Sequence, residues 1–368
     1  MEENTKQGPT DKPQILTRPQ RIKKIALLLS ALIGFNLFVL GAFYYSFFNK
    51  NQAASLNSPI SNSISPAPFP FQEITIPYLR SRDYKSQLGE LAEVSKNSNY
   101  TSFLTNYISD GNKINGFLTI PAGGKPENGW PAIVFVHGYI PPKNYQTLVN
   151  YSSYVDYLAK NGFVIFKIDL RGHGQSEGEP GGGYYSGDYI VDTLNAKAAL
   201  QNANFVNPDK IGLWGHSMAG NVVSRALAAS PNIPAVAIWA GAVYTYEDLA
   251  EFGIDDNSYQ PPPSESPSRK KRNELVERYG QFDPNSSFWK QVPITNYLSG
   301  IKGAISLNHA LDDPVVSIEF SRNLNSLLDK TSIHHELNEY PTGGHNFSGA
   351  AFNQAMQKTV EFFNKYLK

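Results

Sequence analysis

The alternation of short apolar runs with helical patterns, from Asn99 to the end of the chain, constrains the fold most strongly. Apolar runs that can be fully buried strands are each followed by a segment with helical spacing, which is typical of a sheet wrapped by helices. The expected strands are residues 132–136, 162–170, 210–214, 234–240 and 303–308, and the expected helices are about 144–160, 188–203, 218–229, 317–330 and 350–367. The sequence therefore predicts an α/β fold with a mostly parallel, doubly wound sheet.

Three departures from plain alternation are expected. Tyr100–Ser109 and Asn112–Pro121 flank the turn dipeptide Asp110-Gly111, which predicts an antiparallel hairpin at the start of the sheet. About 60 residues separate the strands at 234–240 and 303–308, too many for a plain connection, so residues 244–300 are expected to form a small cap insertion near the substrate mouth. A short helix is also expected near Lys85–Lys96.

The N-terminal part has a different character. Residues 25–48 carry no charged side chain and, as a helix, would span about 36 Å, enough to cross a hydrocarbon core of about 30 Å. Four Lys and Arg residues stand just before this segment and one just after it, so the positive-inside rule places the N-terminus in the cytoplasm. A cleaved signal peptide and a buried core helix are the rival interpretations, but the apolar run is long for a signal peptide and apolar all round.

These features predict four regions. Residues 1–24 are expected to be a cytoplasmic tail, 25–48 a transmembrane anchor, 49–70 a disordered Ser/Pro/Asn linker, and 71–368 the catalytic domain on the outer side of the membrane. The linker assignment rests on an uncharged stretch that has too little apolar area to fold.

The charge balance and the cysteine count exclude several functions. Lys plus Arg and Asp plus Glu both number 32, so there is no bulk electrostatic attraction to nucleic acid. Without cysteine the chain has no disulfide, no thiol nucleophile and no thiolate metal site. The histidines form no H-x-x-x-H or H-E-x-x-H pattern, so neither a metal nor a cofactor is expected.

Residues 215–220, GHSMAG, nearly match the nucleophile elbow G-x-S-x-G, with Ala219 at the last glycine position. A strand precedes Ser217 and a helical pattern begins at Met218, so the serine lies at the strand-to-helix turn that the motif requires. A serine that merely caps the following helix would have the same spacing. The motif favours Ser217 as a nucleophile, and the presence of an acid and a base elsewhere in the sequence distinguishes this role from that of a helix cap.

Candidates for an acid and a base follow the serine in the order expected for this kind of site. Residues 307–316 end a buried strand and place Asp312 and Asp313 in a loop, and either of these could instead cap the next helix. Residues 340–347 place His345 in a glycine-flanked loop before the last helix. A histidine oriented by a carboxylate can take the proton of a serine hydroxyl, so the three loops predict a Ser-Asp-His triad.

Two backbone N–H groups are expected to form an oxyanion hole. One is that of Met218, directly after the nucleophile and at the N-terminus of a helix. The other is that of Tyr139, in the loop after His137-Gly138; its side chain could also form a wall of the pocket.

From Asn99 onward the chain resembles the α/β-hydrolase superfamily, and it is most similar there to the catalytic domain of the prolyl oligopeptidase family. The resemblance is carried by YISDGNKINGFLTIP with WPAIVFVHGY, by IDLRGHGQSEG, and by FWKQVPITNYLSGIKGAISLNHALDDPVV. It implies Ser217 as nucleophile, His345 as base, Tyr139 and Met218 as oxyanion donors, and Asp313 as the acid, because residues 309–313 align with H-G-x-x-D.

The sequence thus predicts a membrane-anchored serine hydrolase that needs no cofactor and acts on a peptide or small-molecule substrate. A prolyl-oligopeptidase-like peptidase is the first hypothesis and a carboxylesterase the second. A non-catalytic binding protein on the same scaffold is a third, supported only by alanine at positions 219 and 310 in place of glycine. The substrate and the oligomeric state are left open.

Overall fold

The computed structural model describes residues 68–368, which form one compact unit. The tail and anchor predicted at 1–24 and 25–48, and nearly all of the predicted linker, lie outside the described residues. Within the described part, no helix is both long and apolar enough to span a bilayer.

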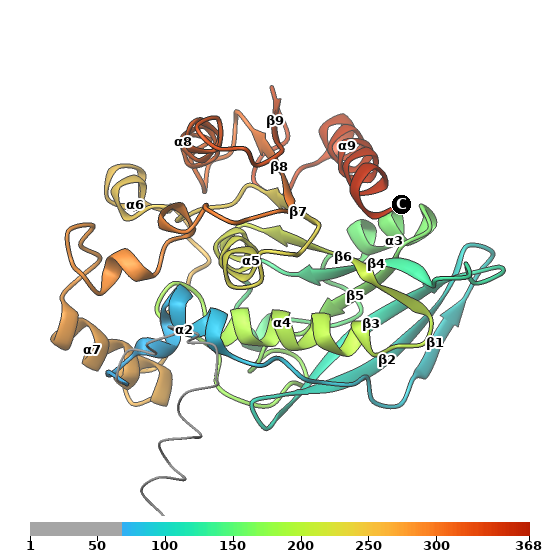
Figure 1. Ribbon diagram of the computed structural model, residues 1–368, viewed down its shortest axis with the longest axis horizontal. Helices are drawn as coiled ribbons and strands as arrows, with labels where there is room; N and C mark the ends of the chain where they lie inside the picture. The colour runs from blue at the N-terminus through green and yellow to red at the C-terminus, as the bar shows by residue number, and fades with distance from the viewer. Residues whose placement is uncertain (1–67) are drawn as a thin grey trace, which may run out of the picture. The chain divides into compact units, whose positions relative to one another are not determined.

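A nine-stranded sheet forms the centre of the unit, with the strand order β1-β2-β3-β5-β4-β6-β7-β8-β9 (Figure 1). The pairs from β1 to β5 through β2 and β3 are antiparallel, and those from β5 to β9 are parallel. The strands are β1 Ala92–Lys96, β2 Tyr100–Ser109, β3 Asn112–Pro121, β4 Trp130–Val136, β5 Val164–Ile168, β6 Val206–His216, β7 Ala235–Trp239, β8 Ala304–Ala310 and β9 His335–Tyr340. The predicted mostly parallel sheet with an antiparallel hairpin at its start is confirmed.

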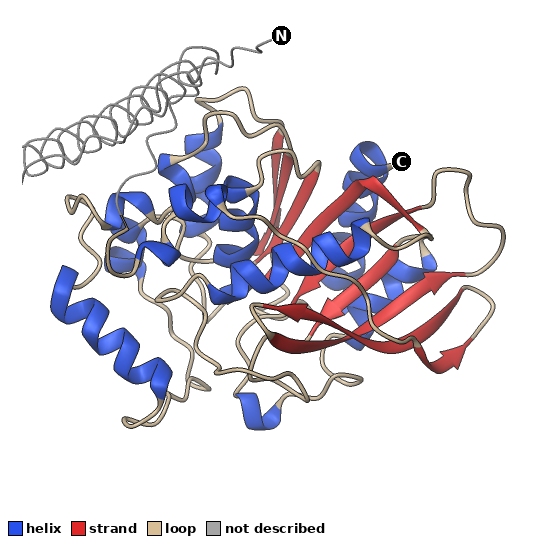
Figure 2. Ribbon diagram, turned by 60° about the horizontal axis from the view of Figure 1, so that its bottom comes forward, coloured by secondary structure: helices blue, strands red, loops and turns tan. Residues whose placement is uncertain are grey.

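Helices cover both faces of the sheet (Figure 1 and Figure 2). Helices α4 and α5 pack with α2 and α8 on one apolar core, and α3 packs with α9 on the other. The helices are α2 Ile76–Ser81, α3 Ser152–Lys160, α4 Asp188–Gln201, α5 Met218–Ala229, α6 Tyr246–Phe252, α7 Pro267–Tyr279, α8 Glu319–Leu328 and α9 Gly349–Leu367, with short 3-10 turns at Gln72–Ile74, Pro142–Asn144, Trp289–Gln291 and Ile294–Asn296. Strands β4, β5, β7 and β8 are almost entirely buried, because a parallel sheet is covered on both faces.

The helix predicted near Lys85–Lys96 is wrong. Residues 85–91 are in neither a helix nor a strand, and residues 92–96 form β1, which pairs with β2; the first described α-helix lies earlier, at α2. Every residue of β1 is exposed, so no apolar pattern distinguishes the strand, and the backbone bonds to β2 decide the structure. The predicted helix at 144–160 is shorter than expected, because a loop occupies residues 145–151 before α3.

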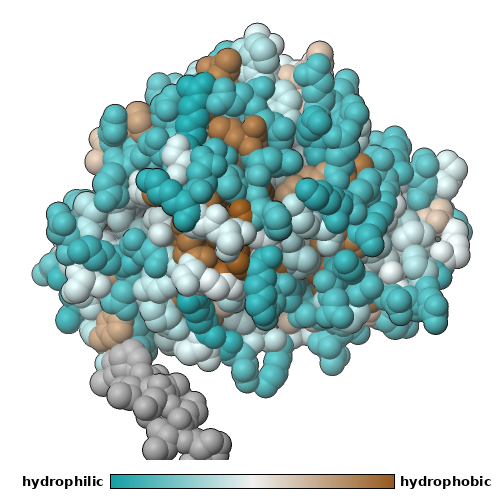
Figure 3. All heavy atoms as spheres, turned by 45° about the horizontal axis from the view of Figure 1, so that its top comes forward, coloured by the Kyte–Doolittle hydropathy of each residue, from teal (hydrophilic) through white to brown (hydrophobic). Residues whose placement is uncertain are grey.

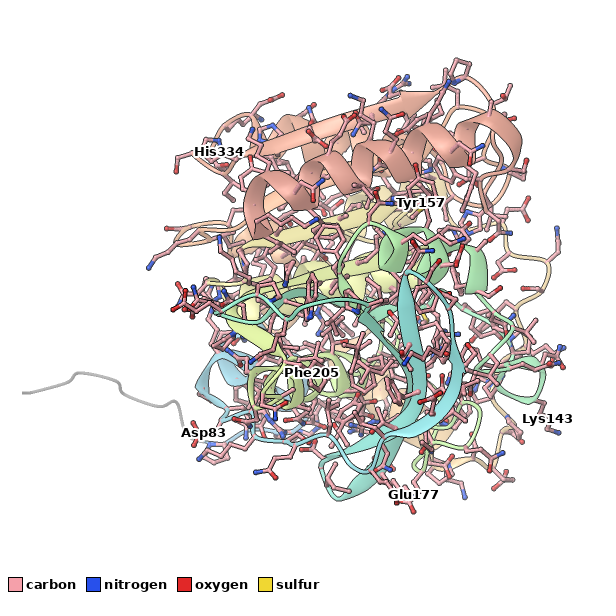
Figure 4. The ribbon with its side chains drawn as sticks, turned by 90° about the vertical axis from the view of Figure 1, so that its right-hand side faces the viewer. Asp83, Lys143, Tyr157, Glu177, Phe205 and His334 are labelled. Carbon is pink, nitrogen blue, oxygen red and sulfur yellow. The ribbon has the colours of Figure 1, made fainter. Side chains whose placement is uncertain are left out.

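The amino ends of the parallel strands lie at one edge of the sheet and their carboxyl ends at the opposite edge. In Figure 4, His334, which directly precedes β9, lies near one edge of the molecule, and Lys143, which follows β4, lies near the opposite edge. The loops that follow β4, β6, β8 and β9 all leave from the carboxyl ends of the parallel strands. In sheets of this kind ligands bind at that edge, and all the predicted site residues lie there.

The segment between β7 and β8 contains α6, α7 and two 3-10 turns, and it includes the residues 244–300 expected to form a cap. Helix α7 begins at Pro267, because Ser266 accepts a hydrogen bond from the Arg269 N–H and proline is favourable in the first turn. On the face drawn in Figure 3, hydrophilic side chains cover most of the surface and hydrophobic residues show through in separate small patches.

Candidate active site

Ser217 lies in a strained turn between β6 and α5. Its φ of 56° and ψ of −122° are unusual for a residue with a side chain. The Ser217 N–H donates to the Trp239 carbonyl at 2.9 Å, which helps to hold this conformation. A Cβ on Gly215 would lie 2.7 Å from the Ala219 carbonyl oxygen, so only glycine fits two residues before the nucleophile. The local structure is that of a nucleophile elbow, which presents the serine side chain above the edge of the sheet.

The structure brings Ser217, His345 and Asp313 together from three different loops. The His345 Nε2 atom is 2.9 Å from the Ser217 Oγ, and its Nδ1 atom is 2.8 Å from Oδ2 of Asp313. A carboxylate can only accept, so Nδ1 carries the hydrogen when Asp313 is ionised, and Nε2 is then free to accept the serine proton. The three side chains have the arrangement that activates a serine hydroxyl.

The side chain of Asp313 is 1% exposed, and its surroundings favour the charged form. Burial raises the pKa of Asp313, but hydrogen bonds from His309 and His345, the charge of His345 and a backbone N–H outweigh burial, so this pKa lies below its usual range. Oδ1 accepts from the N–H groups of Val315 and Val316 at 2.8 and 3.0 Å. The carboxylate therefore stays ionised at neutral pH.

His309 is a further partner of Asp313 that sequence reasoning missed. The ring is fully buried, and its Nε2 atom lies 3.3 Å from Oδ2 of Asp313 and 3.0 Å from the Val316 carbonyl. Its Nδ1 atom lies 2.8 Å from the Ser321 hydroxyl. The alignment of residues 309–313 with H-G-x-x-D includes this histidine, and this was the one sequence signal that could have identified its role.

The N–H groups of Tyr139 and Met218, the two predicted oxyanion donors, lie on the loops that follow β4 and β6. Within residues 68–368, neither group donates a hydrogen bond to another residue. By contrast, the neighbouring Gly138 N–H donates to the Tyr151 hydroxyl at 3.0 Å. The two unused donors are therefore available to a ligand at Ser217, and the Met218 N–H has the added positive potential of a helix N-terminus.

A cleft of about 850 Å³ opens over Ser217 and His345. One wall consists of Tyr139, Tyr151 and Tyr154, and another of Phe347 and Phe352. Residues 255–258, from the segment between α6 and α7, also line the cleft. The site is thus a cleft of ligand size that combines aromatic walls with many polar side chains, among them Asn150, Asp256 and Asn346.

A short segment that we call the strap, residues 254–260, crosses the cleft between two of its loops. The Asp255 N–H donates to the Val315 carbonyl at 2.9 Å, close to Asp313. At the other end the Gln260 N–H donates to the Tyr139 hydroxyl at 2.8 Å, and this hydroxyl faces the Gln260 carbonyl at 3.2 Å. The Tyr139 and Tyr259 rings also pack together, with centroids 5.3 Å apart. The strap is therefore bound to both the acid loop and the oxyanion loop.

Among residues 68–368, no group of three or more His, Asp or Glu side chains is arranged to hold a metal ion. His137 and His173 lie in the loops that follow β4 and β5 and pack against each other, with ring centroids 4.9 Å apart. Burial lowers the pKa of both imidazoles. Both residues are buried, and their rings pack within the core of these loops.

Comparison with known proteins places this geometry in context. Residues 130–255, which include the elbow, match the family described as serine aminopeptidase, S33. A protein of Salmonella typhi named YfhR is 30% identical over 124 residues, which are 34% of this chain and 39% of YfhR. A Bacillus subtilis protein described as a peptidase, YuxL, is 22% identical over 261 residues, 70% of this chain and 37% of YuxL. The chain therefore spans only part of the length of these relatives.

Solved structures of both peptidases and esterases share the fold. Acylaminoacyl peptidase from Pyrococcus horikoshii superposes with a TM-score of 0.55 and 18% identity, over 73% of this chain and 42% of that one. Acetyl xylan esterase 1 from Thermoanaerobacterium superposes with a TM-score of 0.52 and 21% identity, over 77% and 89% of the two chains. The chain therefore has the α/β-hydrolase fold, which it shares with solved structures of both peptidases and esterases.

Proposed function

We propose that the protein cleaves amide or ester bonds by forming an acyl-enzyme on Ser217. The observation that carries this proposal is the series of hydrogen bonds from Ser217 Oγ through His345 to Asp313, with separations of 2.9 and 2.8 Å, of which Ser217 and His345 line the cleft. The strained backbone of Ser217 is a second support, because such strain persists where the surrounding structure holds a functional residue in place.

The geometry leads to a two-step reaction. His345 Nε2 takes the Ser217 proton while Oγ attacks the substrate carbonyl, and the N–H groups of Met218 and Tyr139 stabilise the negative charge that forms on oxygen. His345 then gives the proton to the leaving amine or alcohol, which departs and leaves the acyl group on Oγ. His345 takes a proton from a water molecule as the water oxygen attacks this ester; the bond to Oγ then breaks, the acyl group leaves as the carboxylic acid, and His345 returns the proton to Oγ. Asp313 holds the imidazole in position and stabilises its positive charge.

We place a peptidase of the prolyl oligopeptidase type first and a carboxylesterase second. The peptidase hypothesis is supported by the serine aminopeptidase family match and by the likeness to YuxL and acylaminoacyl peptidase. The esterase hypothesis is supported by the likeness to acetyl xylan esterase, because the superposition covers 89% of the esterase chain. Peptidase and esterase chemistry use the same triad and oxyanion hole, so the lining of the cleft decides between them.

Two measurements test the function. The full-length protein and its Ser217→Ala variant are first treated with a fluorophosphonate probe, and only the wild type is expected to be labelled. The wild type is then assayed on matched p-nitrophenyl esters and aminoacyl p-nitroanilides. Equal labelling of both proteins would refute the nucleophile assignment, and an absence of labelling and turnover in both would favour the non-catalytic binding protein.

We also propose that residues 25–48 anchor the protein in a membrane, with the N-terminus in the cytoplasm and the catalytic domain outside. The uncharged segment and the excess of Lys and Arg before it support this topology. The protein is expected to stay with the membrane fraction after carbonate washing and to be digested by protease added to intact cells. Release by carbonate, or protection from the protease, would contradict the proposal.

A further inference from the structure

The hydroxyl of Tyr151 lies between two loops of the site that are far apart in the sequence. It is 3.0 Å from the Gly138 backbone nitrogen and 2.7 Å from the Nδ1 atom of His216. The peptide group that follows Gly138 carries the Tyr139 N–H, a proposed oxyanion donor, and His216 directly precedes the nucleophile. One side chain, from the residue just before α3, thus contacts both the oxyanion loop and the elbow.

His216 continues this connection to the third loop. Its ring is 1% exposed, and its Nε2 atom lies 2.7 Å from the backbone carbonyl oxygen of His345. The rings of His216 and His345 pack at a centroid distance of 4.7 Å. His216, in the nucleophile turn, is therefore hydrogen-bonded to the backbone of His345, whose side chain is the proposed base.

The groups at the two ends of this series of hydrogen bonds, the Gly138 N–H and the His345 carbonyl, determine the direction of every bond in it. A carbonyl oxygen only accepts, so the His216 Nε2 atom must carry the hydrogen, and Nδ1 of the neutral ring is then an acceptor. The Tyr151 hydroxyl must consequently donate to Nδ1, and its oxygen accepts from the Gly138 N–H. Burial, followed by the charge of His345, lowers the pKa of His216 to about 3, so the ring is neutral at physiological pH.

The tight packing around the chain leaves little freedom for other arrangements. A Cβ on Gly138 would lie 2.8 Å from the Tyr151 hydroxyl oxygen and 3.1 Å from Nδ1 of His216, so only glycine permits the contact. The Tyr151 ring packs edge-on against Phe135 and Trp214, which restricts its rotation. Burial also raises the pKa of Tyr151, so the hydroxyl keeps the proton that it donates.

We propose that Tyr151 and His216 are positioning residues that hold the oxyanion loop, the elbow and the His345 loop in one mutual arrangement. The inference rests on the proposed function of Ser217 and His345, and it assigns a task to two residues that take no proton from the substrate. Because His216 is neutral, the imidazolium that forms on His345 has no second positive charge beside it. The chain of hydrogen bonds from Gly138 through Tyr151 and His216 to His345 thus keeps the proton acceptor and the oxyanion donor in register during acylation.

Four variants of the full-length protein test this inference. Tyr151→Phe removes only the hydroxyl, His216→Ala removes the whole connection, and His216→Gln keeps an N–H that can reach the His345 carbonyl. Tyr107→Phe is the control: its hydroxyl is equally engaged, with the Asp192 carbonyl at 2.8 Å, but it lies outside the site. For each variant kcat and KM are measured on one ester, together with the thermal unfolding midpoint and the rate of fluorophosphonate labelling.

A displacement of about 1 Å at a reacting group can cost about a hundredfold in rate, so we expect His216→Ala to lower kcat by about ten- to a hundredfold. Tyr151→Phe should lower kcat by about tenfold with KM within about threefold of wild type, because the loss falls on the transition state. His216→Gln should recover part of the kcat lost in His216→Ala. The double variant Tyr151→Phe/His216→Ala should be no slower than His216→Ala alone, because the two residues act as one unit.

Several results would overturn the inference. Tyr151→Phe with kcat within about twofold of the control Tyr107→Phe would do so, and since this variant keeps the ring, the outcome is decisive even if His216→Ala does not fold. Losses in the single variants that simply multiply in the double variant would also refute it. If Ser217→Ala is inert while the positioning variants keep full activity, the positioning role fails and the proposed function stands. If Ser217→Ala is labelled like the wild type, the proposed function fails and the positioning role fails with it.

Discussion

Asp312 and Asp313 are neighbours in the sequence, yet they bind different groups of the same loop. Oδ2 of Asp313 lies 2.8 Å from Nδ1 of the His345 ring, whereas Oδ1 of Asp312 accepts a hydrogen bond from the Gly344 N–H at 2.8 Å. Only the first contact becomes stronger when the ring gains a proton. The contact of Asp312 with Gly344 stabilises the loop and does not depend on the protonation of His345.

We expect Asp313→Asn to lower kcat/KM by about 10³- to 10⁴-fold, because an amide can present an N–H to Nδ1 and favour the wrong tautomer of His345. Asp312→Asn should cost less than about tenfold, since an amide oxygen can still accept from Gly344. Both variants are assayed on the same ester, with the unfolding midpoint as a check on folding. Equal losses, or a greater loss in Asp312→Asn, would show that Asp313 is not the acid.

The sheet was largely predictable because its buried strands are continuous apolar runs. Strands β4, β5, β7 and β8 were each expected within a few residues, and the Asp110-Gly111 turn predicted the β2–β3 hairpin. Strand β1 was missed, because an exposed edge strand has no apolar pattern and is stabilised by its neighbour's backbone. The start of α3 was misplaced for a similar reason: residues 145–151 are held by tertiary contacts, such as the Tyr151 hydroxyl with Gly138.

The candidate site was predictable as far as chain order and loop context reach. The elbow motif suggested Ser217, and the order of serine, acid and histidine after β6, β8 and β9 suggested His345. The choice of Asp313 over Asp312 came from a family resemblance, because the two residues are adjacent in one loop and the sequence does not show which side chain faces His345. The Tyr151–His216 contact joins residues 65 positions apart, and no local pattern in the sequence reports such a contact.

The strap offers a test of how the cleft selects substrates. Tyr139→Phe removes the hydroxyl that binds Gln260 and so releases one end of the strap, while the Tyr139 N–H remains. We expect kcat/KM for esters with bulky acyl groups to rise relative to acetate, with the absolute value for acetate within about tenfold of wild type.

The comparison uses p-nitrophenyl acetate and an ester with a long or branched acyl chain. Ile108 serves as a control position because its side chain is 51% exposed and lies on β2, away from the cleft, so Ile108→Ala should leave the ratio unchanged. An unchanged ratio in Tyr139→Phe would mean that the strap does not limit the acyl group.

Asp169 provides a pH-dependent test of stability in the loop region behind the cleft. Its side chain is fully buried, and burial raises its pKa to about 6, despite hydrogen bonds from Thr147 and Tyr145 and the charge of Lys167. In the unfolded chain the group loses its proton near pH 4, so between about pH 4 and 6 the folded state holds more protons. The contribution of Asp169 to the free energy of unfolding therefore falls as pH rises through this window, by about 3 kcal/mol.

The variant Asp169→Asn cannot titrate, so the fall should disappear. We compare the unfolding midpoints of wild type and variant at pH 4 and pH 6.5, where other groups, such as Asp313, contribute equally to both proteins. On going from pH 4 to 6.5, the wild type should lose midpoint temperature relative to the variant. Parallel changes in the two proteins would show that Asp169 has no raised pKa.

The alanine at position 219 is compatible with an active elbow, and the neighbouring glycine explains why. Ala219 is fully buried within the core beside the sheet. The close approach of α5 to the next loop occurs one residue later: a Cβ on Gly220 would lie 2.6 Å from the Gly241 Cα atom. The methyl group of Ala219 therefore fills space in the core, and glycine is needed at 220.

Ala219→Gly should consequently change kcat/KM by less than about tenfold, which corresponds to about 1.4 kcal/mol. It should lower the free energy of unfolding by about 1 to 2 kcal/mol, because glycine disfavours the helix and a buried methyl group is lost. Gly220→Ala should be the harmful change, with loss of folding or of most activity, because two backbones would have to separate. If the wild type is inactive on every ester and amide and Ala219→Gly becomes active, then the elbow is blocked by alanine and the scaffold serves binding instead.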